Sequence, residues 1–210
     1  HLYYGDEAGT PGSVMTYFPF GQMPRGRRGT GEVGVTEFAV PKGALGFWRD
    51  RLAAQGVTGL TEGSFLGEAR LGFDGPDGDN FALVESELRG RTPWTGTDVP
   101  EEAGILGFNG ARFRLKDEAA TGELLGFMGY QKDESEGNVT RYRIEGGNAA
   151  DTIDIEALPD AKTSATWGWF PAWSSAGASG RWAGAGSEPR RAGGGALRAC
   201  IRVPVSAAAE

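Results

Sequence analysis

The sequence predicts an α+β fold of repeated βαβββ modules: two complete modules, part of an earlier one, and an irregular C-terminal tail. Three observations support this fold class. Short segments of alternating apolar residues, typical of strands, are separated by glycines, which number 36 among the 210 residues. Two other segments carry apolar residues at helical spacing. The same order of elements then occurs twice, which indicates a structural repeat.

The first complete module spans residues 32–88. It opens with an alternating strand that stops at Pro41, and a helix over 43–55 follows, with Leu45, Trp48 and Leu52 on one face. Three further strands complete the module, and the last two are joined by a tight turn over 75–78. These strands are expected at 64–68, 69–74 and 80–86.

The second complete module spans residues 105–159 and repeats this order. Its first strand contains Phe108, Ala111, Phe113 and Leu115. Its helix, 118–129, is expected to bury a stripe of Leu124, Leu125 and Met128. A closing hairpin follows, with Tyr142 and Ile144 on one strand, Ile153 and Ile155 on the other, and a turn at 146–148.

Four segments lie outside these modules. Residues 1–22 are expected to form the closing hairpin of a truncated first module, with strands at 2–4 and 14–18. Residues 23–31 are a Gly/Arg linker, and residues 89–104 are a second linker. Residues 160–210 form a low-complexity tail that is expected to be disordered or frameshifted.

The tail departs sharply from the modular pattern. From Ser164 onward it contains four of the six tryptophans, no lysine, and no long periodic apolar segment. Three origins fit this composition: a flexible tail, an aromatic-rich interaction segment, or a frameshifted reading of GC-rich DNA. We favour the frameshift, because the pattern ends where another module is due.

Composition excludes several classes of function. The formal net charge of −7 argues against a nucleic-acid surface, and the one dense basic cluster, Arg25, Arg27 and Arg28, is interpreted as a solvated loop. No long apolar run and no signal peptide are visible, so we expect no membrane contact and a cytoplasmic location. Cys200 is the only cysteine, which excludes disulfides and cysteine zinc sites within the chain.

Several motifs resemble one known family. They are His1–Gly12 (HLYYGDEAGTPG), Thr16–Pro19 (TYFP), Pro24–Gly31 (PRGRRGTG), Phe38–Pro41 (FAVP) and Phe47–Leu52 (FWRDRL). Together they are similar to the glyoxalase-like ring-cleaving dioxygenases, which act on hydroquinones and belong to the vicinal-oxygen-chelate superfamily. The resemblance covers about residues 1–162, and its opening stretch is the most specific part.

The resemblance implies four modules and an iron(II) cofactor. In the family, a His from the first module and a His and a Glu from the fourth hold the metal, and the middle modules are structural. A facial triad of two His and one carboxylate leaves open positions for substrate and dioxygen. A chain whose only histidine is His1 cannot build such a triad, so we expect this chain to bind no iron and to be a fragment that lacks both ends.

Mapping the family's ligands onto this chain finds no intact metal site. The weak candidates are His1, which is more often a polar residue at a strand end, and Glu156, which more often faces solvent. Elsewhere the equivalent positions hold Val33-Gly34 and Asn109-Gly110, which cannot supply imidazole. Beyond Thr163 there is no histidine, and Glu188 and Glu210 do not lie in a suitable strand.

Three functional hypotheses follow. The full-length protein would open a hydroquinone or catechol ring, a small aromatic substrate, with iron(II) and dioxygen in an extradiol-type reaction, while this chain is inactive. Alternatively, it would be a non-catalytic binding protein of the bleomycin-resistance type for small aromatic compounds, with Tyr3, Tyr4, Tyr17, Phe18 and Phe20 lining a groove. A nonfunctional gene fragment is the third hypothesis, and it is the one we favour for this 210-residue chain. Unpaired apolar sheet faces would then favour a homodimer or aggregation.

Overall fold

The computed structural model describes residues 2–5, 13–17, 26–76, 78–93, 95, 98–146 and 150–163. Predictions for His1, Arg25, Phe18, Phe20 and the tail from Ser164 onward therefore lie outside the described residues. In the described parts of the chain, neither helix combines the length and the apolarity that crossing a membrane requires.

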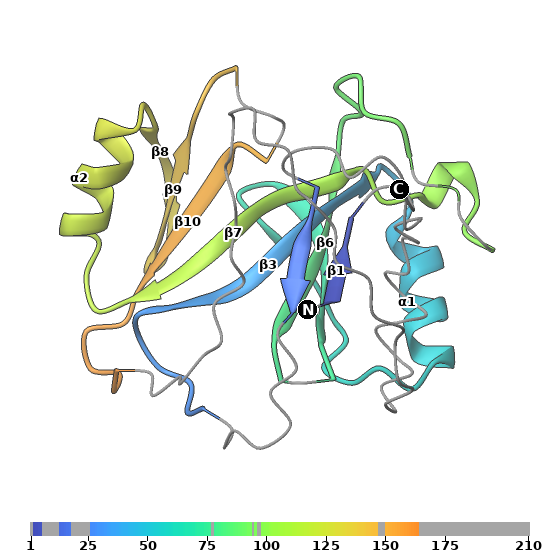
Figure 1. The fold of residues 1–210 in the computed structure, drawn as a ribbon, viewed down its shortest axis with the longest axis horizontal. Helices are drawn as coiled ribbons and strands as arrows, with labels where there is room; N and C mark the ends of the chain where they lie inside the picture. The colour runs from blue at the N-terminus through green and yellow to red at the C-terminus, as the bar shows by residue number, and fades with distance from the viewer. Residues whose placement is uncertain are drawn as a thin grey trace, which may run out of the picture.

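One eight-stranded sheet carries both complete modules, and its strands run in the order β4-β5-β6-β3-β7-β10-β9-β8. Figure 1 shows helix α1 at one end of this twisted sheet and α2 at the other. The strands are β3 (Glu32–Pro41), β4 (Thr61–Phe65), β5 (Glu68–Asp74), β6 (Asn80–Ser86), β7 (Gly107–Leu115), β8 (Gln131–Glu136), β9 (Val139–Arg143) and β10 (Thr152–Ala157).

The strand order is a palindrome of two equivalent halves. In each half the first strand pairs in parallel with the last one, β3 with β6 and β7 with β10, and two antiparallel strands follow outward. The halves join through the antiparallel pair β3 and β7. The predicted α+β fold with repeated βαβββ modules is confirmed.

The helices α1 (Leu45–Ala54) and α2 (Ala119–Phe127) end in the same way. Gly56 and Gly129 follow them with φ of +73° and +96°, a left-handed conformation that glycine adopts without steric cost. After α1, Val57 N–H donates to the Leu52 carbonyl at 3.0 Å, and after α2, Tyr130 N–H donates to the Leu125 carbonyl at 2.9 Å. A hydrogen bond of this kind, around a left-handed glycine, is typical of a Schellman motif. Both helices end in this motif because they occupy equivalent positions in the repeated module.

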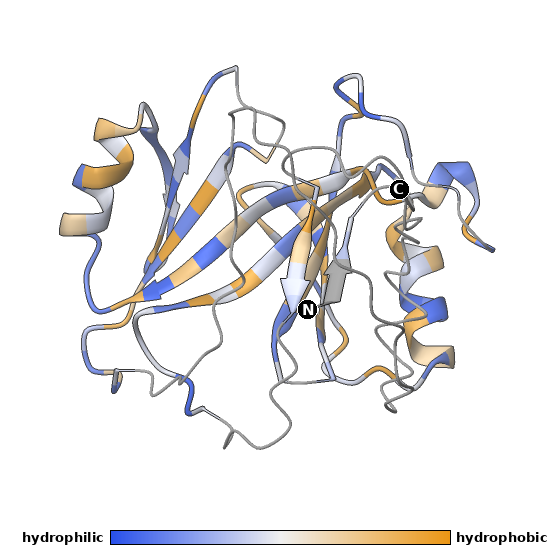
Figure 2. Cartoon of the chain, viewed as in Figure 1, coloured by the Kyte–Doolittle hydropathy of each residue, from blue (hydrophilic) through white to orange (hydrophobic). Residues whose placement is uncertain are grey.

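Each helix covers its own apolar core on one face of the sheet. Trp48 and Leu52 of α1 are fully buried against the β3–β5–β6 half, and the Trp48 indole N–H donates to the Ala103 carbonyl at 2.8 Å. Leu125 of α2 packs on the smaller core that includes Ile153 and Ile155. Hydrophilic and hydrophobic residues alternate along β7 and β10 in Figure 2, as expected when one face is apolar.

A separate two-stranded sheet, β1 (Leu2–Tyr4) and β2 (Met15–Tyr17), forms the hairpin expected near the start of the chain. Met15 is buried in the core beneath α1, and Tyr17 packs against that core. The Tyr17 hydroxyl donates to Asp79 at 2.9 Å. Tyr17 thus supports packing of the hairpin.

The structure differs from the predicted elements in three places. Strand β8 was not predicted, because all six of its residues are exposed and show no apolar alternation. Strand β4 lies at 61–65 instead of 64–68, and four of its five residues are exposed. The predicted linker 89–104 contains a 3₁₀ helix, η1 (Glu101–Ala103), whose Ala103 is buried in the α1 core.

The predicted apolar stripe of α2 is wrong. Only Leu125 is buried, whereas Leu124 and Met128 are about half exposed and Phe127 is 90% exposed. Leu124 and Leu125 are neighbours on a helix and point about 100° apart, so a nine-residue helix on a narrow core buries one of them.

Candidate functional site: the polar face of the sheet

The face of the sheet opposite both helices carries charged side chains, and we call it the polar face. Strand register places alternate residues there. Arg112 lies opposite Val35 across β7 and β3, and Asp154 lies opposite Arg141 across β10 and β9. Among the described residues, we therefore look for a functional site on the polar face.

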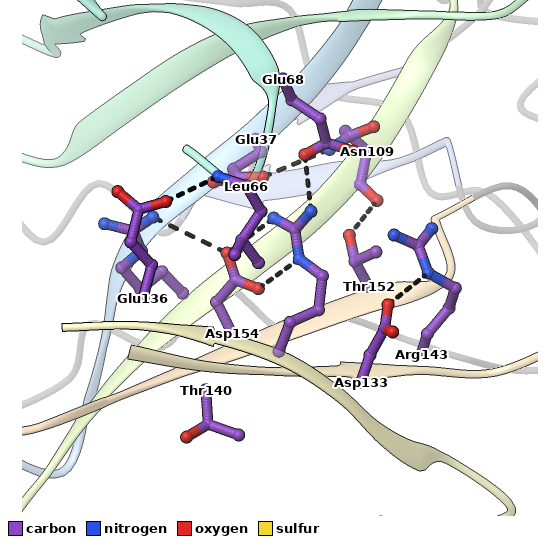
Figure 3. Close-up of polar contacts among 12 residues, drawn as sticks. Glu37, Leu66, Glu68, Asn109, Asp133, Glu136, Thr140, Arg143, Thr152 and Asp154 are labelled. Carbon is purple, nitrogen blue, oxygen red and sulfur yellow. Dashed lines mark hydrogen bonds and ion pairs between the residues drawn. The ribbon is translucent and has the colours of Figure 1, made fainter. Parts of the chain in front are cut away.

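Buried ion pairs connect the strands of this face. Arg141 is 2% exposed and donates through Nε and Nη2 to both oxygens of Asp154, at 2.7 and 3.0 Å, and through Nη1 to Glu68 at 2.6 Å. On the other half, the fully buried Glu37 accepts from Arg70 at 2.8 Å and from Asn109 at 3.2 Å. Figure 3 shows Glu37, Glu68, Asn109 and Asp154 converging on one region.

Phe65 lies among the guanidinium groups of this network. The Cζ atoms of Arg112, Arg70 and Arg141 lie 4.5, 5.0 and 5.4 Å from its ring centroid. Such cation–π contacts strengthen when the partners are shielded from water, and Phe65 is only 8% exposed. The aromatic ring thus fills the space between charged strands of both modules.

The hairpin that carries Phe65 is tied to the opposite edge of the sheet. Leu66 at its tip adopts a φ of +47°, and its N–H donates to Glu136 of β8 at 3.0 Å. This contact joins β4–β5 of one module to β8 of the other, as does the Arg141–Glu68 pair. These two contacts therefore join the two modules near Phe65.

The carboxylates of Asp154 and Glu68 stabilise the charged form of Arg141. Burial acts to lower the pKa of the Arg141 guanidinium, but hydrogen bonds and charges from Asp154 and Glu68 outweigh it, so the pKa is raised. The guanidinium stays protonated at any working pH. The described carboxylates of this network are held by arginine and are not free to act as bases or metal ligands.

The residues present do not fit an iron site. Glu156, the described candidate ligand, lies on β10 with 25% of its side chain exposed and pairs with Arg114, whose Nε lies 3.4 Å from Oε2. Among the described residues no three His, Cys, Asp or Glu side chains are grouped to hold a metal ion. An iron(II) facial triad needs two imidazoles, and the network offers guanidinium groups instead.

Gly34 and Gly110, which the sequence comparison set against the family's ligand positions as an expectation, have steric roles in the structure. A Cβ on Gly110 would lie 2.5 Å from the carbonyl oxygen of Thr152, and one on Gly34 would lie 2.4 Å from the Arg114 side chain. Asn109 is buried and bonded to Glu37. These positions allow close packing of strands and side chains.

The basic cluster and the aromatic residues do not form one site in the described structure. Arg28 donates to Asn80 and to the Gly78 carbonyl, and Arg27 donates to the Thr163 carbonyl at 3.4 Å. Tyr4 contacts Tyr17 edge to face at 5.6 Å. The two described arginines of the predicted solvated loop thus tie it to β6 and to residue 163.

The polar-face network was not predicted from the sequence, although a signal for it exists. Charged residues recur at every second position on three strands, opposite the apolar set. They are Arg112 and Arg114, Arg141 and Arg143, and Asp154 and Glu156. Such spacing on strands that also carry buried apolar residues indicates a second, charged buried face.

Proteins named as dioxygenases are similar to this chain in sequence and in fold. The chain is 38% identical over 160 residues to MhqO of Bacillus subtilis, named as a ring-cleaving dioxygenase. It is 30% identical over 171 residues to the chlorohydroquinone/hydroquinone 1,2-dioxygenase of Sphingobium indicum. A crystal structure of a Bacillus subtilis protein named as a dioxygenase superposes with a TM-score of 0.72 at 36% identity. These matches support the resemblance to the family of ring-cleaving dioxygenases.

The matches cover most of this chain but only part of each relative. The matches cover 76% and 80% of this chain but 51% and 53% of the two relatives, and the structural match covers 79% of this chain and 53% of the crystallised one. The chain thus spans about half the length of the curated relatives it matches. No family model matches the sequence.

Proposed function

We propose that the protein to which these modules belong is a ring-cleaving dioxygenase for a small aromatic substrate, a hydroquinone or a catechol. The observation that carries the proposal is the 38% identity to MhqO over 160 residues, together with the family's dioxygenase names. Ring opening that places both atoms of dioxygen in the product needs no external reductant. The proposal includes an extradiol-type mechanism, an iron(II) cofactor in the full-length protein and a cytoplasmic location.

Within that protein, the described modules act as scaffold. Their polar face holds Glu37 and Asp154 in arginine pairs and fills its centre with Phe65. The 210 residues include one histidine, His1, too few for a two-histidine triad. We therefore expect the 210-residue chain by itself to be inactive and to bind no iron.

Oxygen uptake tests both parts of this proposal. The 210-residue chain and MhqO are each incubated with iron(II) and hydroquinone in an oxygen electrode, with chelator-treated samples as controls. We expect iron-dependent uptake by MhqO and none by the chain. Iron-dependent uptake by the chain would overturn the scaffold assignment, and a lack of uptake by MhqO with any hydroquinone or catechol would overturn the reaction.

A further inference from the structure

A groove on the polar face lies beside the ion-pair network, over strands β3 to β7. Its volume is about 330 Å³, at the lower end of the range for small-molecule sites. Small residues Gly63, Gly72 and Ala82 form part of its lining, and Gly72 lies opposite Ala82 across β5 and β6. Gly63 is exposed on β4, so the groove is reached from solvent.

Arg112 brings hydrogen-bond donors without partners to this groove. Its Nε and Nη2 are buried and have no hydrogen-bond partner in the described structure. Asp154, which pairs with Arg112 at 3.7 Å, already accepts hydrogen bonds from Arg141 through both oxygens. Because a buried donor without an acceptor destabilises the protein, this guanidinium favours any acceptor that reaches it.

Arg70 adds a second set of donors to the same lining. Its Nη1 is used by Glu37, but its Nε and Nη2 are buried and lack hydrogen-bond partners among the described residues. The Glu68 carboxylate is 3.7 Å from Nη2, beyond hydrogen-bond distance. The groove is thus lined by two arginines, and each has two buried guanidinium nitrogens without a hydrogen-bond partner, on a planar group of the kind that carboxylates match.

The rest of the lining limits which anion fits. Glu62, Asp74 and Asn80 also line the groove. The Asn80 amide donates to Asp74 at 2.7 Å and Glu62 pairs with Arg49 at 3.2 Å, so two carboxylates face an incoming anion. Val35 and Ala82 add apolar surface. A ligand with one carboxylate and an apolar body matches this lining better than a compact multiply charged anion.

We infer that this groove binds the carboxylate of a small organic acid through Arg112 and Arg70, with the acid's apolar body over Gly63 and Gly72. This site is separate from the ring-cleaving reaction proposed above. The inference does not depend on iron or on catalysis by this chain.

Isothermal titration of the full 210-residue chain with benzoate, acetate and inorganic phosphate tests the inference. We expect saturable binding of benzoate and weaker binding of the other two. Arg112→Gln is expected to weaken benzoate at least about tenfold, because a hydrogen bond to a charged group is lost. Phosphate or acetate binding as tight as benzoate, or no saturable benzoate binding by folded protein, would overturn it.

A second variant fills the groove without removing a charge. A Cβ on Gly63 meets no atom within 4 Å, and its backbone is not left-handed, so Gly63→Val is expected to fold and to block benzoate. Gly46 on α1 is equally open and lies outside the groove, so Gly46→Ala is the matched control and should bind normally. Circular dichroism verifies folding of each variant. Unchanged benzoate affinity in folded Gly63→Val would contradict the proposed location.

Discussion

The buried pair between Arg141 of β9 and Asp154 of β10 provides a direct test of how the ion-pair network stabilises the sheet. Asp154→Asn keeps the shape of the side chain but removes its charge and turns an N–H₂ group toward the guanidinium. Both side chains are 2% exposed, so water cannot replace the lost partner. Breaking a buried ion pair on one side costs about 3–5 kcal/mol.

The structure places the expected loss near the lower end of that range. Asp154 receives two of the hydrogen bonds of Arg141, at 2.7 and 3.0 Å, but Glu68 remains as a charged partner at 2.6 Å. We therefore expect a loss of about 3 kcal/mol in the free energy of unfolding. With a urea m-value of about 1–3 kcal/mol/M, the midpoint should fall by about 1 M or more.

Urea unfolding followed by tryptophan fluorescence measures this loss, because Trp48 is fully buried in the folded chain. The exposed pair between Lys42 and Glu87 is the control. Both side chains are about two-thirds exposed, so Glu87→Gln should leave the urea midpoint almost unchanged.

A double variant separates the charge from the packing. Replacing both partners, as Arg141→Met with Asp154→Leu, should recover part of the stability lost in Asp154→Asn, because the buried Arg141 charge is removed together with its partner, while Arg112 and Glu68 each lose one ion pair. A loss in Asp154→Asn no larger than that of the surface control would refute the idea that this pair joins the strands.

Three further perturbations test the sheet and its edges. Gly110→Ala should destabilise the fold by about 1–3 kcal/mol in urea unfolding, because the added Cβ meets the neighbouring strand, whereas Gly46→Ala should cost nothing; equal effects would argue against the close approach. Phe65→Leu should cost about 1–3 kcal/mol in the same assay, since it removes the aromatic face from the arginines, and an unchanged midpoint would argue against those contacts. The hydrogen bond from Lys132 lowers the pKa of Glu118 below its ordinary value. The stability that this pair adds to the fold is therefore present above about pH 4.5 and is lost as pH falls through the lowered pKa of Glu118. The melting-temperature difference between the natural chain and Lys132→Gln should vanish in acid, and a constant difference would refute the linkage.

Local sequence patterns determined most of the elements. Alternation of apolar and polar residues located β3, β6 and β7, since a strand with one buried face repeats every two residues. Helical spacing located α1 and α2, and Gly56 and Gly129 mark where each ends. These signals are carried by neighbouring residues, so a single sequence is enough to reveal them.

Other features depended on contacts between distant residues. Strand β8 carries only exposed residues, and its place at the sheet edge depends on pairing with β9. The exposure of Leu124 and Phe127 reflects how α2 docks on a narrow core, which its own periodicity cannot specify.

The sequence by itself determined the repeated βαβββ order, the family resemblance and the scarcity of histidine. Only the tertiary structure decided that Arg70, Arg112 and Arg141, which come from three different strands, meet around Phe65. The physical reason is that a buried charge is stable only beside its partner, and strand pairing across the sheet decides which carboxylate each arginine reaches.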